Sequence, residues 1–231
     1  MLGILTLDTA FPRIAGDVGC ADTFDFPVRY ATVPGAVPEV VVHRGDDATL
    51  PAFIAAAQVL CDAGALGIAT TCGFLARWQD ALAAALPVPV LTSALLQGAL
   101  VARTLPAGRR LGIVTYSADD LDATVLAAAG VPRDTPVVGV DPAGVFARTI
   151  RFGASALDRG AMSRDVVDAA RRLCAAERDV GAIVLECANM PPYAEAVRDA
   201  TGLPVYDAAE LVRWFHTGLP ARQPRGVRKR G

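Results

Sequence analysis

The feature that most constrains the fold of this chain is an internal repeat with a long spacing. Residues 2–7 (LGILTL) recur as residues 111–116 (LGIVTY), an offset of 109 residues. The apolar run ending at Cys72 likewise matches the run ending at Cys187, and in both copies a Pro-Val pair lies 17 residues later, at an offset of 115. Two matches in the same order, with nearly equal offsets, indicate two duplicated halves.

Short aliphatic runs bounded by glycine and proline alternate along the chain with alanine-rich segments of helical period. This alternation is typical of parallel β-sheets with crossover helices, so the predicted fold class is α/β. Ser93, Ser163 and Asp207 are expected helix N-caps, and Pro191 suits a first helical turn. We expect strands near residues 2–7, 27–33, 65–71, 88–91, 111–116, 136–140, 181–186 and 203–206.

The composition excludes several classes of function. With a net charge of -2 and a pI near 5.7, the chain has no electrostatic footprint for nucleic acid, and its basic tail at 222–230 is expected to be a frayed terminus. The only lysine is Lys229 in that tail, which excludes Schiff-base chemistry and a P-loop. The two histidines, His43 and His216, are expected to be structural or surface residues, and no metal site is predicted.

No segment approaches the roughly 18 uninterrupted apolar residues that a membrane helix needs, and the first residues lack the pattern of a signal peptide. We therefore expect a cytoplasmic protein without a membrane partner. The five cysteines have no CxxC spacing, which fits reduced thiols. Cys61 and Cys174 fall in predicted helices and are assigned to packing, whereas Cys20 stays unassigned.

The other two cysteines stand at equivalent places in the repeat. Cys72, in the segment TTCGF, and Cys187, in the segment ECANM, each close a strand and precede a helix. In open α/β sheets the ligand crevice lies beyond the carboxyl ends of the strands, so a pseudo-dyad between the halves would bring both thiols to one cleft. The positive end of the helix dipole is expected to lower the pKa of each thiol.

Two facing thiols suit one kind of proton transfer. One thiolate removes a proton from a carbon beside a carboxylate or carbonyl, and the other thiol returns a proton to the opposite face. No metal or organic cofactor is needed if hydroxyls and backbone amides stabilise the charge that develops. The residues expected to form this cradle are Thr71, Gly73, Thr115, Tyr116, Ser117, Ala188 and Asn189.

Charged neighbours could assist this chemistry. Asp8 and Thr9, at the end of the first strand, are candidates to receive a substrate ammonium group. Glu186 either raises the pKa of Cys187 by like charge or points away and pairs with an arginine, and strand alternation favours the second. Candidate carboxylate clamps are Arg13, Arg44, Arg77 and Arg151.

These motifs, in this order over nearly the whole chain, resemble the aspartate/glutamate/hydantoin racemase superfamily. The resemblance implies two Rossmann-like halves, residues 1–95 plus 207–231 and residues 96–206, with the active site in the cleft between them. It also implies that Cys72 and Cys187 are the paired acid and base, and it allows a homodimer. Racemases for aspartate and glutamate usually follow the first cysteine with Asn-Thr and carry Gly-Cys-Thr at the second. This chain has Gly73-Phe74 at the first place and Glu186-Cys187-Ala188 at the second, and Phe74 adds an apolar wall.

Three hypotheses follow for the function. The first is a cofactor-independent racemase or epimerase, an isomerase that acts on a small carboxylate-like substrate such as an amino acid or a cyclic imide. The second is another reaction on the same scaffold, either cis-trans isomerisation or decarboxylation of a small dicarboxylate. The third is a two-lobed binding protein without catalytic activity, although ligand binding does not require the two thiols.

Overall fold

The computed structural model describes residues 1–220 and contains two parallel β-sheets of four strands each. The first sheet has the strand order β2-β1-β3-β4, and the second repeats it as β6-β5-β7-β8. Strands were therefore correctly predicted at all eight places. Their bounds are β1 Leu2–Thr6, β2 Val28–Thr32, β3 Ile68–Thr70, β4 Val90–Leu91, β5 Arg110–Thr115, β6 Val137–Gly139, β7 Val180–Leu185 and β8 Val205–Tyr206.

The two glycines of the repeated strand motif allow helices to approach the sheets closely. A Cβ atom on Gly3 would lie 2.8 Å from Cδ1 of Ile68 and 3.0 Å from Cδ1 of Leu60, which lies in α1. A Cβ atom on Gly112 would lie 2.8 Å from Cδ2 of Leu173 in α6. A side chain at either position would push these methyl groups aside, so the repeated Leu-Gly-Ile sequence has a packing cause in both halves.

Helices connect successive strands, as expected for parallel sheets. Ser93 and Asp207 are N-caps as predicted, since their side chains accept hydrogen bonds from the following turn. The cap predicted at Ser163 is wrong, because α6 begins four residues earlier and Asp158 accepts from the backbone N–H of Ala161. The helices are α1 Leu50–Asp62, α2 Gln79–Ala85, α3 Gly98–Thr104, α4 Ala123–Ala128, α5 Val145–Phe152, α6 Arg159–Ala176, α7 Ala194–Thr201 and α8 Ala208–Thr217. Short 3-10 and π segments are η1 Ala21–Thr23, η2 Glu39–His43, η3 Asp47–Thr49, η4 Gly73–Trp78, η5 Ala94–Gln97 and η6 Pro191–Tyr193.

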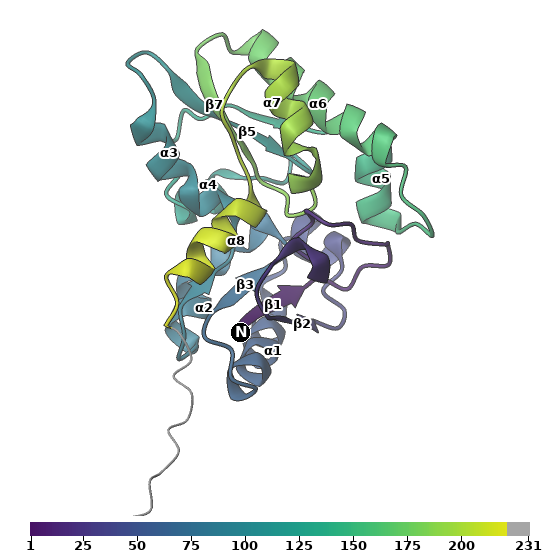
Figure 1. Ribbon diagram of the computed structural model, residues 1–231, viewed down its shortest axis with the longest axis vertical. Helices are drawn as coiled ribbons and strands as arrows, with labels where there is room; N and C mark the ends of the chain where they lie inside the picture. Colours follow the sequence, from purple (N-terminus) through teal and green to yellow (C-terminus); the bar gives the residue numbers. More distant parts are fainter. Residues whose placement is uncertain (221–231) are drawn as a thin grey trace, which may run out of the picture.

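Each sheet and its helices form one lobe, and the last helix, α8, leaves the second lobe and lies along the first (Figure 1). Arg213 of α8 donates to the carbonyl of Thr23, and His216 stacks on Phe26 with ring centroids 3.6 Å apart.

The domain boundaries at 95 and 207 stay a prediction, and the basic tail from 222 lies outside the described residues. Within residues 1–220 no helix is long and apolar enough to cross a membrane.

Candidate functional site

The turns after β3 and β7 bring the two repeated cysteines to one buried cavity between the halves. Cys72 follows β3 as the N-cap of η4, and Cys187 comes two residues after the end of β7. Both side chains line a cavity of about 30 Å³, which is room for roughly one water molecule. Its other walls are mostly apolar, formed by Leu7, Pro38, Val42, Phe74 and Ile150 together with Tyr116.

Burial dominates the acidity of both thiols. Burial, and then the nearby Glu186 carboxyl, raise the pKa of Cys72 to about 12, although the backbone N–H groups of Phe74 and Leu75 oppose the rise. Burial and Glu186 also raise the pKa of Cys187 well above its usual value. The prediction of lowered pKa values is wrong, because removing a thiolate from water costs more than the helix terminus returns. Both groups are therefore neutral thiols near pH 7.

Glu186, the residue before Cys187, lies against Gly73 of the first cysteine turn and is 1% exposed. Its Oε2 accepts a hydrogen bond of 2.8 Å from the hydroxyl of Thr115, and its carboxyl also receives the backbone N–H of Tyr116. Burial nevertheless raises the pKa of Glu186 to about 7. The favoured alternative, pairing with an arginine, is wrong for the described residues, since Glu186 makes no such ion pair there.

Gly73 is the position that allows this carboxyl to lie against the first cysteine turn. A Cβ atom on Gly73 would lie 2.1 Å from Oε1 of Glu186 and 2.7 Å from its backbone oxygen. No side chain fits at that distance. The backbones of the two halves therefore approach each other closely beside the Glu186 carboxyl.

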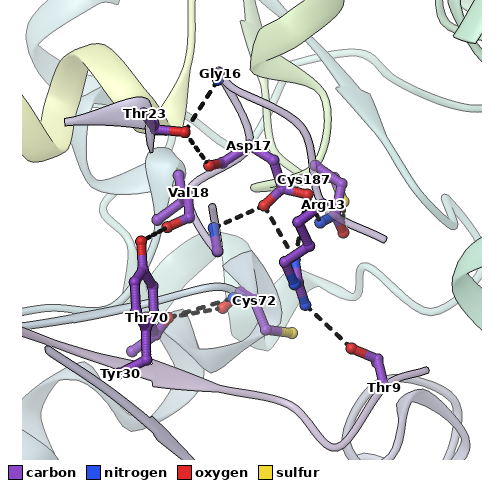
Figure 2. Close-up of polar contacts among 12 residues, drawn as sticks. Thr9, Arg13, Gly16, Asp17, Val18, Thr23, Tyr30, Thr70, Cys72 and Cys187 are labelled. Atoms are coloured by element: carbon purple, nitrogen blue, oxygen red, sulfur yellow. Dashed lines mark hydrogen bonds and ion pairs between the residues drawn. The ribbon is translucent and has the colours of Figure 1, made fainter. Parts of the chain in front are cut away.

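A chain of polar contacts holds Cys187 from the loop after β1 (Figure 2). The Cys187 thiol lies 3.5 Å from Oδ1 of Asn189, whose Nδ2 donates to Asp17 at 2.7 Å. Asp17 also accepts two bonds from Arg13, and Arg13 donates to Thr9. Because a carboxylate can only accept, the Asn189 amide must turn its NH₂ to Asp17 and its oxygen to the thiol.

A second polar chain reaches the cavity from the opposite side. Asp120 accepts from Nδ1 of His43 at 2.7 Å and from the hydroxyl of Ser117 at 2.6 Å. Nε2 of His43 lies 3.3 Å from the hydroxyl of Tyr116. Tyr116 and His43 both line an open pocket of about 500 Å³, so Tyr116 forms a wall shared by that outer pocket and the inner cavity.

Thr71 supplies a free hydrogen-bonding group at the cavity. Thr71 is 5% exposed, and its hydroxyl has no hydrogen-bond partner among residues 1–220. A buried hydroxyl without a partner is costly, so a ligand that bonds to it would recover that free energy.

The structure brings together seven of the predicted site residues and leaves five outside the cavity. Those that line it are Thr71, Cys72, Gly73, Phe74, Tyr116, Cys187 and Asn189. Asp8 is exposed and accepts from the backbone N–H of Gly35, and Thr9 binds Arg13. Thr115 lies behind Glu186, Ser117 faces the outer pocket, and Ala188 lines a separate small cavity. The catalytic and binding roles of all these residues stay predictions.

Sequence reasoning missed Asp17 and Asp120 and assigned His43 no role in the site. Asp17 lies 172 residues from Asn189 in the sequence, and His43 lies 77 residues from Asp120. No local motif marks such pairs. The one available signal was the position of Asp17 and Asp120 in loops that follow strands β1 and β5 at the predicted cleft.

Comparison with known proteins finds lyases among the relatives by sequence. A dimethylsulfoniopropionate lyase of Durusdinium sp. clade D is 29% identical over 226 residues, covering 94% of this chain and 74% of the relative. Dimethylsulfoniopropionate lyase 7 of Emiliania huxleyi is 29% identical over 228 residues, covering 94% of this chain and 67% of the relative. These relatives show that the expectation of a racemase or epimerase is wrong and favour the lyase side of the alternatives.

The fold has counterparts among solved structures. The crystal structure of arylmalonate decarboxylase superposes with a TM-score of 0.62 at 20% identity, covering 96% of this chain and 94% of the other. The predicted architecture of two similar α/β halves is thereby confirmed. The family model described as Asp/Glu/Hydantoin racemase matches residues 21–214. The chain therefore belongs to the Asp/Glu/hydantoin racemase family of enzymes.

Proposed function

We propose that this chain is a lyase that eliminates a neutral sulfide from a small carboxylate with a sulfonium group, with dimethylsulfoniopropionate as the first candidate substrate. The observation that carries the proposal is the buried Glu186 carboxyl beside two thiols in a small, mostly apolar cavity. The sequence relatives named as dimethylsulfoniopropionate lyases support the same class of reaction.

The walls of the cavity suit a methylated cation, and because the space of about 30 Å³ is smaller than the substrate, the side chains around it must shift to admit it. A sulfonium group carries a full charge but cannot donate a hydrogen bond, so it is held by an anion and by aromatic faces rather than by polar donors. Glu186 supplies the anion, and the rings of Phe74 and Tyr116 supply the aromatic walls. The hydroxyl of Thr71, in the first cysteine turn, can donate to the carboxylate of the substrate.

The thiols supply the base once the cation is bound. As the substrate cation approaches the buried thiol, it favours the thiolate and lowers the raised pKa of Cys187, so the thiol releases its proton, taken up in the previous turnover, to solvent. The thiolate sulfur then takes a proton from the carbon beside the carboxylate. The electron pair of that C–H bond forms the new carbon–carbon double bond, and the bond from C3 to sulfur breaks, with its electron pair leaving on the sulfur. The products are acrylate and neutral dimethyl sulfide, and Cys187 is left as the thiol.

We assign the proton removal to Cys187 and the carboxylate side to the turn at Thr71 and Cys72. Cys187 is held in place by Asn189 and Asp17, as a base that must meet one C–H bond should be. Cys72 adjoins the free hydroxyl of Thr71 and can donate its own S–H to the substrate carboxylate. The two cysteines thus have different tasks, although the repeat makes their positions equivalent.

The test is a product assay with purified protein and dimethylsulfoniopropionate. Dimethyl sulfide is measured by headspace gas chromatography and acrylate by proton NMR, and phenylmalonate, glutamate and hydantoin serve as comparison substrates. We expect Cys187→Ser to abolish elimination, Cys72→Ser to retain a reduced rate because serine can still donate, and the control Cys174→Ser to match the wild type. Carbon dioxide release from phenylmalonate without any dimethyl sulfide would replace this proposal with decarboxylation, and equal activity of Cys187→Ser and wild type would refute the assignment of the base.

A further inference from the structure

An elimination differs from a racemisation in what happens to the proton. A racemase returns a proton to its product, whereas the lyase proposed above leaves one proton on its base in every turnover. That base is Cys187, which is 8% exposed and whose raised pKa retains the proton. Elimination at this site therefore requires a route by which the proton reaches solvent, and this requirement rests on the proposed function.

The structure contains one such route next to Cys187. Tyr116 lines the same cavity as Cys187 and is 6% exposed. Burial, and then the proximity of Cys187, raise the pKa of Tyr116 to about 12, so the phenol keeps its proton and can both donate and accept. Its hydroxyl lies 3.3 Å from Nε2 of His43, which borders the outer pocket.

The hydrogen bonds of Asp120 fix the direction of this route. As an acceptor, Asp120 holds the proton of His43 on Nδ1, at 2.7 Å, and takes a second hydrogen bond from Ser117. Nε2 of the neutral imidazole therefore presents a lone pair to the Tyr116 hydroxyl. The carboxylate also stabilises the imidazolium that forms when a proton arrives. The side chain of His43 is 21% exposed and that of Asp120 is 22% exposed, so the far end of the chain is open to solvent.

We propose that Tyr116, His43 and Asp120 form a proton relay that carries the proton abstracted by Cys187 out to the solvent of the outer pocket. The Cys187 S–H releases its proton to one water molecule, for which the shared cavity has room, and this water passes a proton to the oxygen of Tyr116 while the hydroxyl proton of Tyr116 moves to Nε2 of His43. The imidazolium, paired with Asp120, then loses a proton to water, and the Tyr116 hydroxyl turns back to His43. No electron is transferred, and one proton leaves per substrate consumed.

The halves must be closed for this relay to exist. His43 ends η2 in the first half, whereas Tyr116 and Asp120 follow β5 in the second half. The other charged groups that face the relay are Arg151, which is ion-paired with Glu39, and the outer-pocket residues Asp119, Asp141 and Arg172.

The experiment compares steady-state elimination by wild type, His43→Gln, Tyr116→Phe and the control His216→Gln, whose ring stacks on Phe26 away from the cavity. In dilute buffer we expect kcat of His43→Gln to fall about 100-fold or more with KM unchanged, the scale of a lost proton-transfer group. Added imidazole should restore the rate in proportion to its concentration, because a diffusible base can enter the open outer pocket. Tyr116→Phe keeps the ring and should lose kcat in the same way.

The outcomes separate a relay from a structural bridge. Loss of kcat in His43→Gln that imidazole does not restore, or unchanged kcat in both variants, would overturn the relay while elimination by the wild type stands. Absence of dimethyl sulfide from the wild type would instead remove the proposed function, and the relay with it. Thermal melting of each variant shows whether the fold is kept, and Tyr116→Phe decides the question if His43→Gln unfolds.

Discussion

The ionisation of Glu186 should cost the folded protein a measurable part of its stability. Its pKa is raised from 4.5 to about 7 because the carboxyl is fully buried. Below pH 4.5 the folded and unfolded states both carry the proton, and between pH 4.5 and 7 only the folded state does. The free energy of unfolding therefore falls as pH rises through this window and is level above it. At 1.36 kcal/mol for each pKa unit, the loss is about 3 kcal/mol.

Glu186→Gln removes this dependence while keeping the size of the side chain. We expect the free energy of unfolding of the variant, relative to wild type, to increase by about 2 to 3 kcal/mol between pH 5 and pH 8. Urea denaturation followed by circular dichroism at several pH values measures the difference, and Asp168→Asn, at an exposed pair with Arg171, controls for a general change in charge. A constant difference between Glu186→Gln and wild type across this range would show that the carboxyl is not held in its neutral form by burial.

Two further predictions concern the packing and the thiols. Gly73→Ala should lower the free energy of unfolding by about 1 to 3 kcal/mol, since its Cβ would overlap the Glu186 carboxyl, whereas Gly160→Ala, with its nearest neighbour at 3.5 Å, should melt at or slightly above the wild-type temperature. In iodoacetamide labelling at pH 7 followed by peptide mass spectrometry, the half-buried Cys20 should react before Cys72 and Cys187, and faster labelling of the two buried thiols would contradict their raised pKa values.

The repeat was visible in the sequence because it has a local cause. Gly3 and Gly112 each allow a helix to contact a central strand, and the leucine and isoleucine residues around them are buried in the sheets. The start of α6 was misplaced because both Asp158 and Ser163 are suitable caps, and the local sequence does not say which of them the chain uses. Strand positions depend on patterns within a few residues, whereas the choice of the N-cap residue depends on how the loop before the helix packs.

The positions of the two cysteines in the site could be predicted from the sequence, but the acidity of their thiols could not. The places of Cys72 and Cys187 follow from strand ends, but the acidity of the thiols depends on how deeply the two halves bury them. A helix terminus is a local feature, and burial is a property of the assembled fold. Asp17 and His43 were missed for the same reason, because they reach the cavity only through contacts that form when the two halves assemble.

The repeat also explains why a scaffold with two equivalent thiols can support a reaction on one side. At the offset of 115 residues, Thr71 corresponds to Glu186, Gly73 to Ala188 and Phe74 to Asn189. A racemase must move protons on both faces of its substrate, and it therefore benefits from similar surroundings at its two thiols. Here Cys72 adjoins the Thr71 hydroxyl and an apolar ring, and Cys187 contacts an amide fixed by Asp17, whereas the Glu186 carboxyl raises the pKa of both thiols. These unequal neighbours suit a reaction in which one side holds the carboxylate and the other removes a single proton that does not return.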